Sequence, residues 1–130
     1  MSQENVEVVR RAIDAYNPGQ DALDLFDPKI EWVTTGRFVE PDTYRGHEEV
    51  RRYVQALRDD FEELHVEPHE PVNAGDHVIA LVRFTGRGRL SSAPLDLEFT
   101  FVFSLRAGKI VRVRNYREQT DGLEAVGLRE

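Results

Sequence analysis

The chain has 130 residues, of which 40% are hydrophobic and 32% charged, a composition typical of one globular domain over residues 1–130. Seventeen basic against 24 acidic residues give a net charge of −7, which argues against a nucleic-acid partner held by a dominant basic surface. Cysteine is absent, which excludes disulfides, thiolate zinc sites and cysteine nucleophiles. No apolar signal core or membrane-length segment occurs, so a cytoplasmic protein without a membrane partner is expected.

Helical periodicity appears in the first half of the chain. An amphipathic helix is predicted over residues 2–16, and its apolar stripe consists of Val6, Val9, Ile13 and Tyr16. Residues 21–26 predict a short helical piece, and residues 120–127 a last short helix. The clearest helix is predicted over residues 47–64, where apolar residues recur at steps of four and three: Val50, Val54, Leu57, Phe61 and Leu64.

The second half of the chain alternates as strands do. A first strand at residues 29–35 places Ile30, Trp32 and Thr34 on one face, and residues 36–44 predict a loop. Residues 65–72 predict a proline-interrupted edge strand. Two long strands at 77–90 and 94–105 precede a last strand after Gly108. This order predicts an α+β fold with helices on one face of a largely antiparallel sheet.

The register of the last hairpin decides which residues share the core face. A two-residue turn would set Phe103 opposite Arg112, an apolar side chain against a charged one. A three-residue turn with Gly108 in the left-handed conformation sets Phe103 opposite Val111 instead. We therefore expect the three-residue turn.

That register places Asn115 on the core face beside Phe99, with Arg117 beyond it and opposite Leu97. An amide and a guanidinium at the end of an apolar face indicate either that the face leaves the core or that it lines a polar cavity. We expect the cavity.

The outer face of the same strands predicts an interface. It would carry Thr100, Val102, Ser104, Ile110, Arg112, Arg114 and Tyr116, with Ile79, Leu81 and Arg83 on the preceding strand. An apolar patch rimmed by arginines is typical of a protein interface, so a homodimer through this face is expected. In it, Arg112 or Arg114 would reach Glu98 or Asp96 of the second copy. The alternative is that residues 121–130 cover the patch within one chain.

Five segments in order carry a resemblance to a known family: LFDPKIEWV, YRGHEEVRRYV, NAGDHVIALVRFTGRG, FSLRAGKIVRVRNY and LEAVGL. Their order and spacing resemble the SnoaL-like branch of the nuclear transport factor 2-like superfamily, over nearly the whole chain. The resemblance implies a cone, in which a curved, mostly antiparallel sheet wraps around a long helix and encloses a pocket at its open end. Relatives include ketosteroid isomerases, polyketide cyclases, epoxide hydrolases, dehydratases and non-catalytic proteins, so the fold does not decide the function.

The catalytic residues that the resemblance implies for ketosteroid isomerases are missing. The oxyanion-binding tyrosine corresponds to Ala12, the general-base aspartate to Thr34, and the protonated aspartate to Phe101. None of these can perform the role, so that reaction is disfavoured. Tyr16, one turn after Ala12, is the nearest substitute hydroxyl. In some cyclase-like and hydrolase-like relatives, polar residues of the last strand help to form the site, and Asn115 occupies such a position.

Six residues are predicted to bind a ligand: Tyr16, Trp32, Thr34, Phe101, Asn115 and Arg117. Asn115 would orient a carbonyl or hydroxyl group, or it is a buried amide satisfied by backbone or water. Arg117 would hold a carboxylate at the pocket mouth, or it pairs with Glu98 or another surface acid. Trp32 and Tyr16 would line the apolar wall, or they are plain core residues.

His65, Glu67 and His69 share one face of an extended segment, a set that suits zinc or iron. The apolar residues of the segment lie on its other face, so the three would face water on an edge strand. No metal and no organic cofactor is therefore expected.

Together these patterns predict a small-molecule pocket for a mostly apolar ligand, cyclic ligands included, with an unassigned substrate. Isomerase, cyclase or hydrolase chemistry is what the resemblance allows, although no carboxylate or histidine is placed to move a proton. The alternative is a non-catalytic homodimeric binding or interaction domain with a vestigial pocket.

Overall fold

The computed structural model describes residues 2–14, 23–34, 42–69, 71–117 and 123. Its elements follow in this order: α1 (Ser2–Asp14), η1 (Leu23–Leu25), β1 (Phe26–Thr34), β2 (Asp42–Arg45), α2 (Gly46–Asp60), β3 (Phe61–Pro68), β4 (Val72–Ala74), β5 (His77–Gly88), β6 (Pro94–Arg106) and β7 (Lys109–Tyr116). The predicted α+β class is confirmed.

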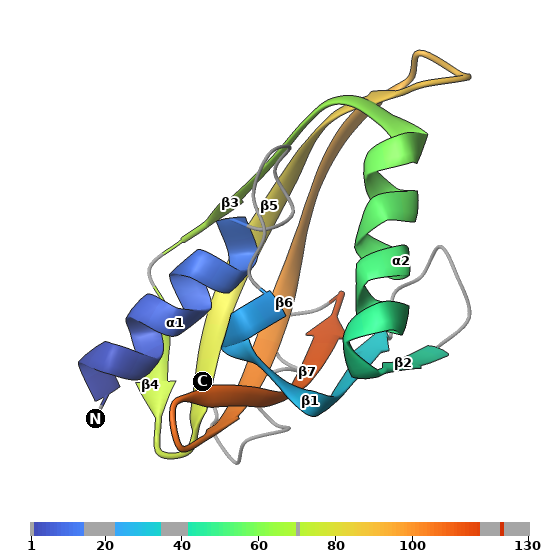
Figure 1. The fold of residues 1–130 in the computed structure, drawn as a ribbon. Coiled ribbons are helices and arrows are strands. Elements are labelled where there is room, and N and C mark those ends of the chain that lie inside the picture. The colour runs from blue at the N-terminus through green and yellow to red at the C-terminus, as the bar shows by residue number, and fades with distance from the viewer. Residues whose placement is uncertain (1, 15–22, 35–41, 70, 118–122, 124–130) are drawn as a thin grey trace.

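The strands form one curved sheet in the order β2-β1-β7-β6-β5-β3, with β4 beside β5. Neighbouring strands are antiparallel except β1 and β7, which run parallel. Figure 1 shows that α2 stands along the concave side and that α1 lies beside β3 and β4. This arrangement is the expected cone.

The core lies on the concave face of the sheet. The apolar stripe of α1 is buried as predicted at Val6, Val9 and Ile13, while Tyr16 lies outside the described residues. β1 buries Ile30, Trp32 and Thr34, which confirms the face predicted for that strand.

The predicted end of the long helix is wrong. α2 ends at Asp60, and Phe61 and Leu64 belong to β3. Their spacing of three imitates a helix because β3 carries a bulge between its pairs with β5, where Glu63 takes a left-handed φ of 55°. Both residues therefore contribute to the core from a strand.

Two further boundaries differ from the prediction, and one predicted helix lies outside the described residues. Residues 42–45 form β2 beside β1, although a loop was predicted there. The extended segment begins at Phe61 and is divided into β3 and β4, with β3 at the sheet edge as expected. The helix predicted near residues 120–127 lies outside the described residues apart from residue 123.

The hairpin between β6 and β7 has a two-residue turn, so the predicted three-residue turn is wrong. Ala107 and Gly108 take left-handed φ values of 52° and 78°, and the flanking Arg106 and Lys109 pair with each other. The left-handed Gly108 is confirmed. A bulge at Val111 then restores the match of apolar faces that a regular two-residue hairpin would lose.

The bulge shifts the pairing by two residues from the prediction. Phe103 lies opposite Val113 and Phe101 lies opposite Asn115, whereas Val111 and Phe99 were the expected partners. The apolar face itself is retained, because a shift of two keeps every side chain on its side of the sheet.

The outer, convex face is less exposed than its pattern predicted. Thr100, Val102 and Ile79 are buried within the single chain, while Leu81 and Tyr116 are half-buried. Ile110 was expected on this face but pairs with Leu105 and is buried in the core, since the bulge turns it inward. Arg112 pairs within the chain, with Glu31 at 3.7 Å.

Candidate functional site

One row of residues crosses the concave face of four strands. Thr34 on β1 lies beside Asn115 on β7, which pairs with Phe101 on β6, which pairs with Ala80 on β5. Thr34 is 5% exposed and Asn115 is 6% exposed. The structure therefore brings together three of the predicted site residues, with two polar side chains inside an apolar core.

Trp32 forms an aromatic wall next to this row, and its predicted contact with a ligand stays a prediction. Its ring meets Phe101 edge-on, with centroids 6.2 Å apart and planes at 89°. It also contacts Phe26 at 5.9 Å and Tyr53 of α2 at 5.7 Å. Trp32 and Phe101 are each 1% exposed, so aromatic packing fixes both rings.

Arg117 continues the face beyond Asn115. Its guanidinium carbon lies 5.5 Å from the centroid of the Phe99 ring, and its Nη1 donates a hydrogen bond of 2.9 Å to the Glu98 carbonyl oxygen. The alternative of a salt bridge to Glu98 is wrong, because the Glu98 carboxylate interacts with His69 at 3.0 Å. The expected partner Leu97 is likewise replaced by Phe99, which follows from the corrected register.

Two tyrosines that the sequence reasoning missed adjoin the wall. Tyr53 of α2 stacks on Tyr44 of β2, with centroids 4.6 Å apart and planes at 27°. Tyr53 follows Val50 by three residues, so the helical stripe was the signal that could have found it. No local pattern indicates Tyr44, which lies in a segment predicted as a loop.

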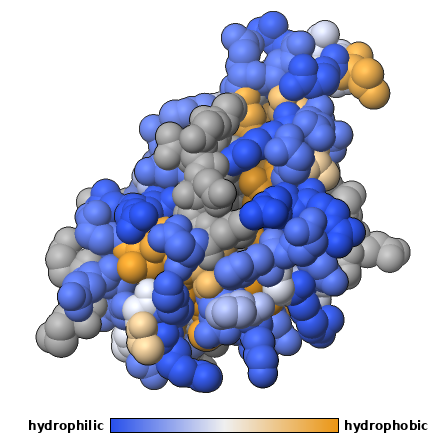
Figure 2. Space-filling view, in the orientation of Figure 1, coloured by the Kyte–Doolittle hydropathy of each residue, from blue (hydrophilic) through white to orange (hydrophobic). Residues whose placement is uncertain are grey.

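Half-buried apolar side chains of α2, β3 and β6 pack against the core, and one of them, Tyr53, contacts Trp32. We call this set the apolar strip, and it consists of Tyr53, Val54, Leu57, Phe61, Leu95 and Phe99. Figure 2 shows apolar atoms at the surface between α2 and the upper parts of β5 and β6. Because these side chains are only partly buried, they are accessible to an apolar group of another molecule.

On the concave face, the described side chains that β1, β5, β6 and β7 bury include hydrogen-bonding groups but no carboxylate or imidazole. Among the described residues, the side chains that β1, β5, β6 and β7 bury on this face are apolar apart from Thr34 and Asn115. Amide and hydroxyl groups can donate and accept hydrogen bonds, but neither titrates near neutral pH. The site can therefore orient a polar ligand group without general acid–base chemistry from these residues.

The three residues weighed as metal ligands lie on the convex side and are exposed. His65 lies 3.7 Å from Glu67, while His69 interacts with Glu98 instead. Over the described part of the chain, no group of three or more His, Cys, Asp or Glu side chains is arranged to hold a metal ion.

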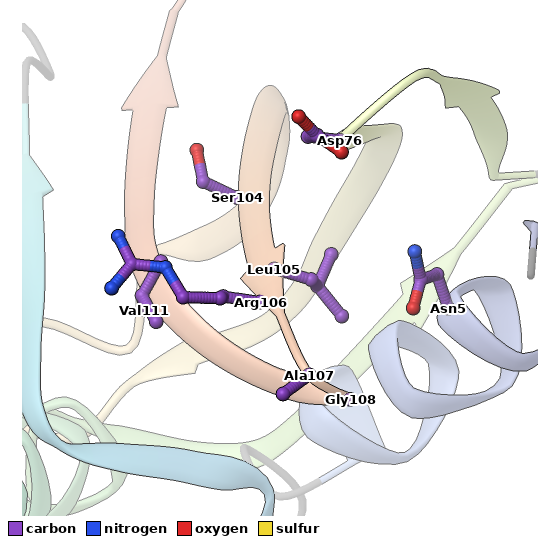
Figure 3. Close-up of a pocket in the computed structure, with 8 residues that line it drawn as sticks. All are labelled: Asn5, Asp76, Ser104, Leu105, Arg106, Ala107, Gly108 and Val111. Atoms are coloured by element: carbon purple, nitrogen blue, oxygen red, sulfur yellow. The ribbon is translucent and has the colours of Figure 1, made fainter.

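A hollow lies at the far end of the β6–β7 hairpin, away from the predicted site. It is lined by Asn5, Asp76, Ser104, Leu105, Arg106, Ala107, Gly108 and Val111. Figure 3 shows that Leu105 points toward Asn5 of α1, while Ser104 and Arg106 point to the other side of β6. The lining side chains therefore diverge around a strand end rather than converge on one point.

A family model identifies the fold from the sequence. The model of the SnoaL-like domain matches residues 9–113, which is most of the chain. The chain belongs to the SnoaL-like family. No curated protein matches it in sequence. None of the described helices is long and apolar enough to cross a membrane.

Solved structures with this fold are similar across nearly their whole length. A protein of ketosteroid isomerase-like fold from Catenulispora acidiphila, in complex with trimethylamine, is 20% identical with a TM-score of 0.77, covering 95% of this chain and 94% of its own. TerC, co-crystallised with polyporic acid, is 19% identical with a TM-score of 0.75, covering 95% and 98%. An NTF2-like protein from Burkholderia xenovorans LB400 is 22% identical with a TM-score of 0.74, covering 98% of both chains. At these identities the similarity supports the fold alone.

Proposed function

We propose that residues 1–130 form a single SnoaL-like domain that binds a small molecule through the concave face. The ligand is mostly apolar, and cyclic molecules belong to this class. The observation that carries the proposal is the row in which Thr34 and Asn115 lie side by side against Phe101. Small-molecule sites combine apolar walls with a few precisely placed polar groups, and two adjacent polar side chains on an otherwise apolar face supply such groups. The predicted ligand contacts are Tyr16, Trp32, Thr34, Phe101, Asn115 and Arg117.

The residue chemistry favours binding over catalysis. Phe101, Thr34 and Ala12 stand where the resemblance implies the catalytic groups of ketosteroid isomerases, and all three are buried. Similar structures were solved in complex with trimethylamine and co-crystallised with polyporic acid, which supports a small-molecule-binding role for a domain of this fold. Any reaction here would consist of orienting a reactive ligand, as a cyclase can do, without a proton carrier from the side chains that β1, β5, β6 and β7 bury on this face.

Calorimetric titration with 2-naphthamide, a neutral bicyclic probe, tests this function. We expect the wild type to bind it and Asn115→Leu to weaken binding by about tenfold, because one hydrogen bond to the carboxamide is lost. Asn73→Leu, at an exposed amide on β4, is the matched control and should leave the affinity unchanged. Native mass spectrometry of the freshly purified protein would in addition detect a co-purified ligand. An empty protein that also fails to bind the probe would contradict the proposal.

A homodimer through the convex face is the second candidate, consistent with the half-buried Leu81 and Tyr116 and the exposed Arg112. Because Val102 is 0% exposed in one chain, the interface would consist of these residues rather than of a large apolar patch. Sedimentation velocity should give twice the chain mass of 15.0 kDa, and Leu81→Arg should shift it to the monomer. A monomeric wild type at micromolar concentration would rule the dimer out.

The expected cytoplasmic location also stays a prediction.

A further inference from the structure

Arg117 holds its positive charge against an aromatic ring and a backbone carbonyl. The guanidinium lies over Phe99 and donates to the Glu98 carbonyl oxygen. The side chain is half-buried, and its Nε is shielded from solvent. Among the described residues no carboxylate forms an ion pair with it. A half-buried charge of this kind gains from a counter-charge that the described part of the chain does not supply.

Two acidic side chains of β6, the strand that pairs with β7, are engaged on the other side of the sheet. Glu98 alternates with Phe99, so its carboxylate lies on the convex side, where it interacts with His69. Asp96 is likewise convex and accepts two hydrogen bonds from Arg83. Neither can neutralise Arg117 without a change of register.

The position of Arg117 relates its charge to the apolar strip. Phe99 belongs to the strip and also carries the guanidinium on its ring. A ring system lying along the strip would therefore bring a substituent at its edge to the free N–H groups of Arg117. Guanidinium N–H groups bind a carboxylate more strongly than a neutral acceptor. Where both carboxylate oxygens are within reach, two parallel hydrogen bonds form.

We propose that the ligand of this site is an amphiphilic anion, with an apolar ring on the apolar strip and one carboxylate or comparable acidic group paired with Arg117. This inference rests on the proposed small-molecule function and narrows its ligand class. The anion supplies the counter-charge, and the Phe99 ring beneath the guanidinium keeps the cation in place before the ligand arrives.

Two probes with the same ring system separate charge from apolar binding. 2-Naphthoate carries a carboxylate where 2-naphthamide carries a neutral carboxamide of similar shape. In calorimetric titrations, wild type should bind 2-naphthoate at least about tenfold more tightly than 2-naphthamide. Arg117→Gln should abolish this preference while the affinity for 2-naphthamide changes little.

Arg112→Gln is the matched control, since it removes the same charge from β7, the strand that Arg117 directly follows, on the opposite face of the sheet. It should keep the preference for 2-naphthoate. If wild type bound both probes with equal affinity, the proposal of an anionic ligand would be overturned and the proposed function would stand. This comparison uses wild type alone, so it tests the proposal even if Arg117→Gln fails to fold. An equal loss in Arg112→Gln would assign the preference to net charge and overturn the role of Arg117. Failure of both probes to bind would count against the proposed function itself.

Discussion

Thr34 and Asn115 lie side by side on β1 and β7, the strands that run parallel within the described sheet. Their side chains point to the concave face, where each is almost fully buried. Parallel strands need a long connection, so residues far apart in sequence meet at this point. The two polar groups of the site are therefore positioned by the closure of the cone rather than by any local motif.

Substitution of Phe101 tests whether its ring is buried in the core, as the register of β6 and β7 requires. Truncation to Phe101→Ala should lower the free energy of unfolding by about 3–5 kcal/mol, because the ring is 1% exposed and contacts Trp32, Phe84 and Phe103. Leu90→Ala, at a fully exposed hairpin tip, should change it by less than about 0.5 kcal/mol. Urea unfolding measures both. A cost below about 1 kcal/mol for Phe101→Ala would mean that the ring does not face the core.

Face assignment succeeded from sequence wherever two-residue alternation continued unbroken. Ile30, Trp32 and Thr34 share a buried face as their spacing predicts. The errors of register fall at bulges, since one extra residue changes the register without a distinctive composition. The bulge at Val111 moved the partner of Asn115 from Phe99 to Phe101.

The fold class and the polar end of the last strand were predictable, but the environment of Arg117 was not. A guanidinium near a surface acid pairs with it by default, and Glu98 was the obvious partner. Strand alternation sends the Glu98 carboxylate to the convex side and leaves only its carbonyl oxygen for Arg117. Tyr44 was missed for a related reason, since the short β2 has too few residues to show a period.

The bulge in β3 makes a prediction about Gly86 on β5. A Cβ at this position would lie 3.0 Å from the Glu62 carbonyl oxygen and 3.2 Å from the Leu64 Cα, both backbone atoms that cannot easily move. Gly86→Ala should therefore destabilise the protein by about 1–3 kcal/mol in urea unfolding.

Glu63→Gly is the matched change on the facing strand, because Glu63 itself is left-handed at φ 55°. Glycine adopts this conformation without the steric cost that other residues carry, so stability should be unchanged or slightly raised. The opposite order of the two variants would show that the bulge does not exist in solution.

The hairpin turn between β6 and β7 should be improvable. Ala107 and Gly108 are both left-handed, which is the requirement of the type I′ turn that favours Asn-Gly. Ala107→Asn should raise the free energy of unfolding by about 0.5–1 kcal/mol, while Ala107→Val should lower it because β-branched residues avoid this region. Thermal and urea unfolding of the pair measure the difference. Equal stability of the two variants would contradict the two-residue turn.

Arg83 and Asp96 form a two-point hydrogen-bonded ion pair on the convex side, with Nε to Oδ1 at 2.9 Å and Nη2 to Oδ2 at 2.8 Å. These hydrogen bonds, assisted by the positive charge of Arg83, lower the pKa of the Asp96 carboxyl below its ordinary value. A depressed pKa in the folded state means that the pair contributes stability above the ordinary carboxyl pKa. That contribution is lost as the pH falls through the depressed value.

Titration of the Asp96 carboxyl carbon by NMR should show this depressed pKa in the wild type. In Arg83→Gln the pKa of Asp96 should rise toward the ordinary carboxyl range, because the neutral amide replaces both charged donors. High salt should reduce the depression in the wild type, since the pair is exposed to solvent. Arg87→Gln removes an equal charge from the same strand at an exposed position and should leave the titration of Asp96 unchanged. An unchanged pKa of Asp96 in Arg83→Gln would show that the two-point pair does not persist in solution.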